Sequence, residues 1–227
     1  MYSLLLLNGG VGARVGADQP KQLLKVNGIP IIVYSLVAVD KIDEIDQIVL
    51  NYPTGWRDAV EEILRSYSIK TPVVLVEAGS TRHSSVSAML PHVKNKNVVV
   101  HESARPLVTK REFEDLIADE NVNVSYMLPI PFTVAPVTPE TKEVTGYLDR
   151  DQLRNVQLPQ KFDKDVLQEA HRFAEREQIE FTEDATLIAT AGFPVFFKDG
   201  SDRNFKITNS LDVAIATSLL HKEDNNE

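Results

Sequence analysis

Residues 6–24, LLNGGVGARVGADQPKQLL, place several glycines and two basic side chains in one short segment near the start of the chain. The residues of interest are Gly9, Gly10, Gly12, Arg14 and Lys21. Glycine lets the backbone approach a phosphate closely and present N–H groups to it, and nearby cations can neutralise its charge. The segment therefore favours either a phosphate-binding loop or a glycine-rich turn that carries surface charges.

Two common phosphate-binding fingerprints do not fit this segment. The P-loop needs a Lys-Ser or Lys-Thr pair directly after its last glycine, and no such pair follows here. The dinucleotide fingerprint G-x-G-x-x-G starts in register at Gly10 and Gly12, but Val15 stands where the third glycine is required. The glycine register thus argues against a dinucleotide-dependent oxidoreductase.

The bulk composition narrows the classes of partner. The chain has 227 residues, no cysteine, a formal net charge of −9 and a sequence pI near 5.1. A negative surface disfavours nucleic acid and anionic membranes as main partners, although a few local cations can still bind a small anion. The opening MYSLLLL is too short for a signal peptide, and no apolar run reaches the length of a membrane span. We therefore expect a cytoplasmic protein with no disulfide, no nucleic-acid partner and no membrane partner.

Strand and helix patterns alternate through the first half of the chain. The expected strands are residues 2–8, 45–52, 71–79, 96–103 and 123–132. The expected helices are residues 29–39, 55–67, 81–93 and 109–120, the last with Thr109 as its N-cap. Such alternation predicts an α/β fold with a mostly parallel sheet and helices on both faces, and ligands then bind outside the carboxyl ends of the strands.

The alternation stops between about residues 131 and 159. This stretch is rich in β-formers and proline, has no helical period and is too long for an ordinary connection. It predicts two extended segments around a turn at TPET, forming a β-arm inserted in a single domain of residues 1–227 and suited to packing against a second subunit. After the arm we expect helices over 164–178 and from Thr182 as N-cap, a strand over 193–199, and a last helix over 210–220.

Six segments, in chain order, resemble the motifs of the CTP-dependent polyol-phosphate cytidylyltransferases, a family that includes 2-C-methyl-D-erythritol 4-phosphate and ribitol-5-phosphate cytidylyltransferases. They are GGVGARVGADQPKQLL (9–24), AGSTRHSSV (78–86), HESARPLV (101–108), YLDRDQLRNVQLPQKF (147–162), FTEDATL (181–187) and SDRNFKIT (201–208). One such match would be weak, but six in order cover nearly the whole chain. The resemblance implies a Rossmann-like fold with a β-arm exchanged between the two subunits of a homodimer.

The resemblance also implies a reaction and a set of site residues. A polyol phosphate would attack the α-phosphate of CTP and release pyrophosphate, so the chemical problem is the meeting of two anions. Arg14, Lys21 and Lys206 would be the catalytic cations, and Thr133 and Arg150 on the arm would bind the acceptor. Glu102 would hold Mg²⁺. The nucleotide-binding residues would be Asn8, Gly9, Gly10, Gly12, Gly79, Ser80, Arg82 and Ser85.

Several readings stay open at the level of sequence. Glu102 replaces the family's usual aspartate, and Arg203 replaces an acid of the methylerythritol enzymes. These departures favour the ribitol-phosphate branch, which serves teichoic acid or capsule synthesis, over the isoprenoid branch. They also leave room for a non-catalytic nucleotide-binding homologue. Ser80 and Ser85 have helix capping as their alternative role, and Arg105 is expected to order its loop.

Overall fold

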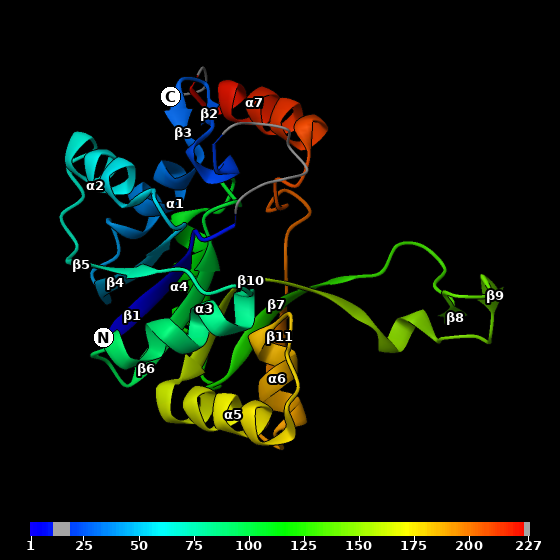
Figure 1. The fold of residues 1–227 in the computed structure, drawn as a ribbon. Helices are drawn as coiled ribbons and strands as arrows, with labels where there is room; N and C mark the ends of the chain where they lie inside the picture. The colour runs from blue at the N-terminus through cyan, green and yellow to red at the C-terminus, as the bar shows by residue number, and fades with distance from the viewer. Residues whose placement is uncertain (11–18, 225–227) are drawn as a thin grey trace.

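A computed structural model describes residues 1–10 and 19–224, with side chains described as far as Leu220; the predicted site residues Gly12 and Arg14 lie outside this range. Its main sheet is built from β1 (Tyr2–Leu7), β4 (Ile45–Tyr52), β5 (Val73–Glu77), β6 (Asn97–Glu102), β7 (Val124–Pro129), β10 (Arg154–Asp163) and β11 (Phe196–Asp199). The strand order is β11-β7-β10-β6-β1-β4-β5. β10 runs antiparallel to β6 and β7, and the other pairs are parallel. The predicted mostly parallel α/β sheet is confirmed (Figure 1).

Helices cover both faces of this sheet. Since consecutive strand residues point to opposite faces, a single strand contributes to the buried cluster on each side. In β1, Leu4 and Leu6 belong to one buried cluster and Leu5 and Leu7 to the other. The first cluster includes residues of α1 (Ile31–Val39), α2 (Arg57–Ser66) and α4 (Lys110–Ile117). The second includes residues of α3 (Arg82–Met89), α5 (Lys164–Glu177) and α6 (Asp184–Thr190). A strand buried on both faces explains the continuous apolar run at the start of the chain.

Three local predictions can be compared with the structure. Thr109 caps α4 as expected, in a reciprocal capping box with Glu112. The prediction that Thr182 caps the next helix is wrong, because α6 begins one residue later with Glu183 at its N-cap position. The helix expected from Ile29 begins at Ile31, since Ile29 and Pro30 form β3, a short strand that pairs with β2 (Lys25–Val26).

The arm projects away from the main sheet (Figure 1). Its tip pairs β8 (Val137–Thr138) with β9 (Glu143–Val144) around the predicted turn, and η3 (Arg150–Gln152) lies on the return path. The predicted arm range ends too late, because β10 begins at Arg154 and already pairs with β7 there. Phe132 and Tyr147 on the arm are 78% and 77% exposed, so the arm has little apolar cover within this chain.

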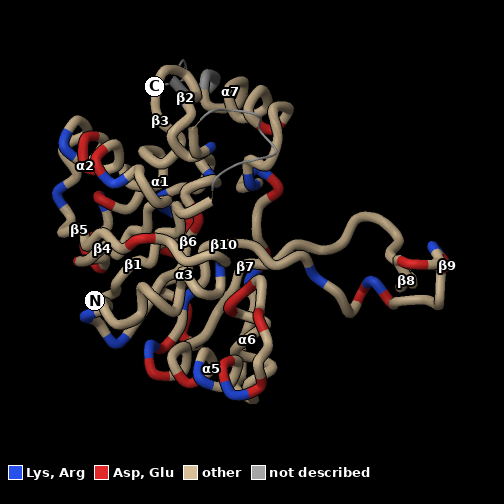
Figure 2. Tube along the Cα trace, viewed as in Figure 1, with Lys and Arg blue, Asp and Glu red and all other residues tan. Residues whose placement is uncertain are grey.

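A smaller buried cluster joins the two ends of the chain. Val26 and Ile31 pack with Ile207 and with Ala216 and Leu220 of α7 (Ser210–Asp224). The single-turn helices η1 (Lys21–Leu23) and η2 (Leu90–His92) complete the described elements. Over residues 1–10 and 19–224, none of the helices has the length and hydropathy needed to cross a membrane. In Figure 2, which colours the Cα trace by residue type, basic and acidic residues are interleaved along α2 and α5.

Candidate active site

A cavity of about 460 Å³ lies at the carboxyl ends of β1, β4, β5 and β6. This is where an open α/β sheet binds its ligands, because the loops that follow the strands converge there. Its lining residues are Leu7, Gly9, Gly10, Lys21, Gln22, Asn51, Pro53, Thr54, Ala78, Gly79, Ser80, Thr81, Arg82, Ser85, Glu102, Ala104 and Lys206. The cavity thus brings together residues from the first, second, third and last of the six sequence motifs.

Glu102, the last residue of β6, is surrounded by three cations. The Nζ atom of Lys206 lies 2.9 Å from its carboxylate, Nε of Arg105 lies 3.6 Å away and Nε of Arg82 lies 3.7 Å away. Only 7% of the Glu102 side chain is exposed. Burial raises the pKa of Glu102, but the charges of Lys206, Arg105 and Arg82 outweigh burial and hold the pKa below its usual value. The cavity wall therefore carries an ionised carboxylate in a cationic setting.

Arg82 connects this carboxylate to the start of α6. Its Nη2 lies 2.8 Å from Oδ2 of Asp184 and 3.4 Å from Oε2 of Glu183. Burial raises the pKa of Asp184, but Arg82 overcomes burial and lowers the pKa to about 2. For Glu183 burial dominates and raises the pKa to about 7, with Arg82 opposing it. The pKa of Asp184 is the lower of the two because Arg82 lies closer to it and His171 Nε2 lies 3.4 Å from its Oδ1.

Lys21 lines the same cavity and comes from η1. Its Nζ donates to the Ile207 carbonyl at 2.7 Å, next to Lys206 in the chain. Two predicted catalytic lysines are therefore joined through one short segment. Arg105 donates through Nη1 to the Asn204 carbonyl at 2.8 Å, which confirms the expectation that Arg105 orders its loop.

The loop before α3 is held by serine and threonine side chains. Thr81, not Ser80 or Ser85, is the N-cap of α3, in a capping box with Ser84, so the helix-capping alternative for those two serines is wrong. Ser85 instead accepts a hydrogen bond from the Gly79 amide at 3.1 Å. A Cβ atom on Gly79 would lie 2.3 Å from the Ser84 hydroxyl oxygen, so this position has no room for a side chain. Ser80 is exposed at the cavity.

Some predicted site residues lie elsewhere. Thr133 and Arg150 are exposed on the arm and do not line the cavity; Arg150 donates to the Pro131 carbonyl at 3.2 Å. Asn8 is fully buried behind the cavity wall rather than on its surface. The sequence motifs assign no role to Asn51, to Gln22, to Asp184 of α6 or to Glu183 at the N-cap of that helix. A polar residue at the end of a predicted parallel strand, as in Asn51, was the signal available for the first of these.

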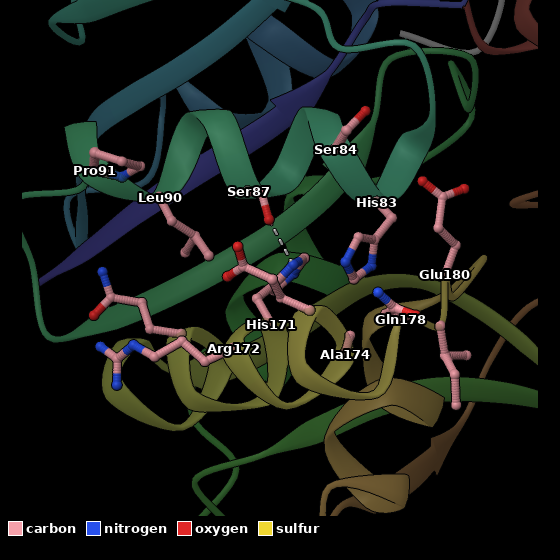
Figure 3. Close-up of a pocket in the computed structure, with 13 residues that line it drawn as sticks. His83, Ser84, Ser87, Leu90, Pro91, His171, Arg172, Ala174, Gln178 and Glu180 are labelled. Atoms are coloured by element: carbon pink, nitrogen blue, oxygen red, sulfur yellow. Dashed lines mark hydrogen bonds between the residues drawn. The ribbon is translucent and has the colours of Figure 1, made fainter.

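A second cavity, of about 580 Å³, lies between α3 and α5 (Figure 3). His83 and His171 meet at its floor with ring centroids 4.4 Å apart, and His171 Nδ1 lies 2.9 Å from the Ser87 hydroxyl. This groove is not at the carboxyl ends of the strands. The first cavity, which contains the predicted residues, is therefore the candidate active site.

Within the part of the chain that the structure describes, the candidate site has too few side-chain ligands to hold a divalent cation by itself, so a substrate would have to supply the remaining ligands. Over the described residues, no group of three or more His, Cys, Asp and Glu side chains is arranged to hold a metal ion. Mg²⁺, however, is commonly bound through one or two carboxylates together with substrate phosphates and water. The ionised carboxylate of Glu102 at the cavity wall meets that requirement.

Comparisons with known proteins agree along the whole chain. A sequence model of 2-C-methyl-D-erythritol 4-phosphate cytidylyltransferase matches residues 3–222. The enzyme of that name from Bacillus cereus is 36% identical, covering 97% of this chain and 98% of the relative, and ribitol-5-phosphate cytidylyltransferase from Lacticaseibacillus paracasei is 31% identical, covering 99% and 100%. The solved structure of the Thermus thermophilus 2-C-methyl-D-erythritol 4-phosphate cytidylyltransferase has a TM-score of 0.76 at 28% identity over 96% of this chain and 98% of that chain. An Anaerococcus prevotii structure at 23% identity shows the same fold, with a TM-score of 0.84 over 97% of this chain and 96% of its own.

Proposed function

We propose that this chain, which belongs to the 2-C-methyl-D-erythritol 4-phosphate cytidylyltransferase family, joins CTP to ribitol 5-phosphate or a similar alditol phosphate. The match of the family model to residues 3–222 confirms the family that the sequence motifs predict. Members of this family are CTP-dependent nucleotidyltransferases. In the reaction, an oxygen of the acceptor phosphate forms a bond to the α-phosphorus of CTP. The bond from that phosphorus to the bridging oxygen breaks, and pyrophosphate leaves with the electron pair.

One observation carries the proposal: the ion-pair cluster of Glu102 with Lys206, Arg82 and Arg105 at the cavity wall. A reaction between two anions needs fixed positive charge where negative charge develops. Lys206 and Arg105 approach Glu102, and Arg82 divides its contacts among Glu102, Asp184 and Glu183. Three cations are thus gathered at the cavity wall although the whole chain carries a formal charge of −9. A non-catalytic homologue has no need for such a cluster.

Lys21 and Lys206 are the described residues to which we assign transition-state stabilisation. They approach the cavity from η1 and from the segment before α7, and the Ile207 carbonyl links them. Lys206 is 39% exposed, so its Nζ can reach a phosphate from its place beside Glu102. Arg14, outside the described residues, is proposed as the third cation on the strength of the loop motif alone.

The nucleotide is proposed to lie along the remaining cavity wall. Gly9 and Gly10 present backbone next to Lys21, and a Cβ atom on Gly9 would lie 2.4 Å from Cβ of Ala78. The adjoining wall is the loop of Gly79 and Ser80, which the capping box of α3 and the Ser85 hydroxyl hold in place. Backbone groups and hydroxyls can recognise the amine and carbonyl of cytosine by hydrogen bonding.

The family depends on divalent cations, and we assign Glu102 as the residue that holds Mg²⁺ against the triphosphate. The metal, when bound, supplies further positive charge at the phosphates. Its neighbouring cations keep the pKa of the Glu102 carboxyl below its usual value, so this residue would supply an anionic oxygen ligand to the metal.

The acceptor site is proposed to form between two copies of the chain. Thr133 and Arg150 are exposed on the arm and distant in the chain from the cavity residues, and the arm carries apolar side chains without cover, among them Phe132 and Tyr147. A homodimer that exchanges arms would cover these side chains and bring both polar residues to the partner's cavity. Since CTP and the absence of cysteine both suit a reducing compartment, we propose that the enzyme acts in the cytoplasm.

The second candidate acceptor is 2-C-methyl-D-erythritol 4-phosphate. The relatives and solved structures that carry this name favour it, including the Bacillus cereus protein at 36% identity. Glu102 and Arg203, at positions where the methylerythritol enzymes carry aspartates, favour the alditol phosphate. Incubation with CTP, Mg²⁺ and each acceptor, with pyrophosphate release as the readout, separates the two. Release with ribitol 5-phosphate supports the first candidate, release only with methylerythritol phosphate selects the second, and no release with any polyol phosphate contradicts both.

The proposed role of the arm predicts a selective defect. In Arg150→Ala we expect the KM for the acceptor to rise about 10-fold while the KM for CTP stays unchanged, because an arginine–phosphate contact is lost far from the nucleotide. Steady-state kinetics with each substrate varied in turn measure the two constants. Lys142→Asn, an exposed substitution at the arm tip, is the control and keeps both constants. An equal rise in both KM values for Arg150→Ala would place the defect in folding or assembly.

A further inference from the structure

Gln22 stands beside Lys21 in the chain, yet its side chain points into the protein rather than toward solvent. It is 2% exposed, and its Nε2 donates to the Asn8 carbonyl at 2.7 Å. Asn8 can only accept there, so this hydrogen bond also fixes which end of the Gln22 amide faces it. The bond joins η1, which carries Lys21, to the residue that directly follows β1.

Asn8 is in turn tied to the other strand ends that line the cavity. Its backbone amide donates to Oδ1 of Asn51 at the end of β4, and its side-chain Oδ1 accepts from the Ser103 hydroxyl at 2.7 Å. Ser103 directly follows Glu102 and also lies 3.1 Å from the Leu7 carbonyl. Asn8 and Ser103 are each 0% exposed.

The result is a buried chain of contacts that links two residues lining the cavity, Lys21 and Glu102. It runs from Lys21 through its neighbour Gln22 to Asn8, then to Ser103 and its neighbour Glu102. Asn8 is held at its amide, its carbonyl and its Oδ1, and a buried group held by three hydrogen bonds can shift only by breaking them. Transfer between two anions is sensitive to such spacing, since misplacement by about 1 Å can cost roughly 100-fold in rate.

We infer that Gln22 is a positioning residue, whose amide contact with Asn8 fixes Lys21 relative to Glu102 and Lys206 across the cavity. The inference rests on the proposed function, because it assigns Gln22 a role in the same site. Gln22 need not touch the substrate for this role. Its predicted effect is on the rate of the chemical step and not on the binding of either substrate.

The opposite edge of the sheet offers a matched control. Gln47 near the start of β4 is 6% exposed, and its Nε2 donates to the His92 carbonyl at 2.9 Å, much as Gln22 donates to Asn8. Gln47 also accepts hydrogen bonds from Ser3 and from the Lys94 amide. Replacing Gln47 by methionine therefore removes at least as much buried hydrogen bonding as Gln22→Met does, but far from the cavity.

The test compares the two methionine variants, which keep the side-chain length. In Gln22→Met we expect kcat to fall roughly 10- to 100-fold, with both KM values unchanged. In Gln47→Met we expect the melting temperature to fall at least as far, with kcat unchanged. Normal kcat in Gln22→Met, or an equal loss in Gln47→Met, overturns the inference.

Two further measurements separate this inference from the proposed function. In a Lys21→Ala background, Gln22→Met should cost no additional activity, because the residue acts through Lys21; an additive loss contradicts this. Independently of turnover, labelling by an amine-reactive reagent followed by mass spectrometry should show Lys21 reacting faster in Gln22→Met, with Lys164 as the internal reference. Unchanged labelling overturns the inference even if the wild-type protein proves inactive on every acceptor, an outcome that would contradict the proposed function alone.

Discussion

The amino ends and the carboxyl ends of the central strands, called here the amino edge and the carboxyl edge, both bury polar side chains. They differ in how completely these side chains are hydrogen-bonded. At the amino edge, Ser3 donates to Gln47 at 2.6 Å and Asn95 donates to Ser3 and Asp46, so the buried polar side chains satisfy one another. At the carboxyl edge polar side chains are also buried, but over the described residues Asn8 Nδ2 and Gln22 Oε1 have no hydrogen-bond partner.

This difference in hydrogen bonding indicates that the two edges have different roles. Buried polar groups are normally all paired, and unpaired ones in a native protein need a reason. At the amino edge Ser3, Gln47 and Asn95 bond to one another, whereas the carboxyl edge keeps Glu102, Lys206 and Lys21 around an open space of about 460 Å³. Substitutions of the same type at the two edges should therefore affect stability alone at one and turnover at the other.

The largest expected effect is at Lys21. Its Nζ donates to the Ile207 carbonyl at 2.7 Å, and at the amino edge the Nζ of Lys164 donates to the Val93 carbonyl at the same distance. We expect Lys21→Ala to lower kcat/KM by about 1000-fold, because a fixed cation at the developing charge is lost. Pyrophosphate release measures the loss. Lys164→Ala should keep normal turnover, and comparable losses in the two variants would remove the distinction between the edges.

A somewhat smaller loss is expected at Lys206. It pairs with Glu102 at 2.9 Å, as Lys94 pairs with Asp46 at 3.0 Å at the amino edge. In Lys206→Ala we expect kcat to fall about 100-fold, since Arg82 and Arg105 remain to hold the carboxylate in place. Lys94→Ala breaks an exposed pair and should leave kcat within a factor of about 2. Single-turnover kinetics assign the loss to the chemical step, and wild-type kcat in Lys206→Ala would exclude it from catalysis.

The third effect concerns stability against pH. Burial raises the pKa of Glu183 from 4.5 to about 7, so the native protein holds this proton more tightly than the unfolded chain does. The contribution to the free energy of unfolding is therefore full below pH 4.5 and lost as the pH rises to about 7, a change of about 2–3 kcal/mol. Glu183→Gln should remove this slope in urea denaturation curves measured at the two pH values.

Asp46 at the amino edge gives the contrasting case. A hydrogen bond from Lys94, opposed by burial and supported by Asn95, lowers its pKa below 3.8, so its contribution is present above that pH and is lost only in stronger acid. The stability difference between wild type and Asp46→Asn should consequently be flat from pH 4.5 to 7. A slope for Asp46→Asn equal to that for Glu183→Gln would show that the two edges do not differ in electrostatics.

The sequence predicts local structure better than it predicts contacts between distant segments. The strands and the helices that follow them are indicated by local patterns, such as the apolar run of β1 and the capping box at Thr109. The sequence pattern places residues 154–159 of β10 in the arm, because the segment continues a proline-containing extended stretch and its partner strands, β6 and β7, come much earlier in the chain. Similarly, nothing local to Glu102 indicates Lys206, 104 residues away, as its partner.

The ordered motifs predict the residues that line the site, but they do not predict which residues support them through hydrogen bonds. Lys21, Arg82, Glu102 and Lys206 lie in segments that resemble a family, and the structure brings all four to one cavity. Gln22 and Asn51 support them through hydrogen bonds to Asn8, a position whose burial is set by tertiary packing. Such supporting contacts depend on where four strand ends meet, which a linear pattern does not specify.

The central claim, that the carboxyl edge is the CTP site, is tested most directly by a crystal structure of the protein with CTP and Mg²⁺. We predict a triphosphate between Lys21 and Lys206, with Glu102 at the metal and the cytosine ring against the loop of Gly79 and Ser80. A nucleotide bound instead in the groove between α3 and α5, beside His83 and His171, would contradict the account.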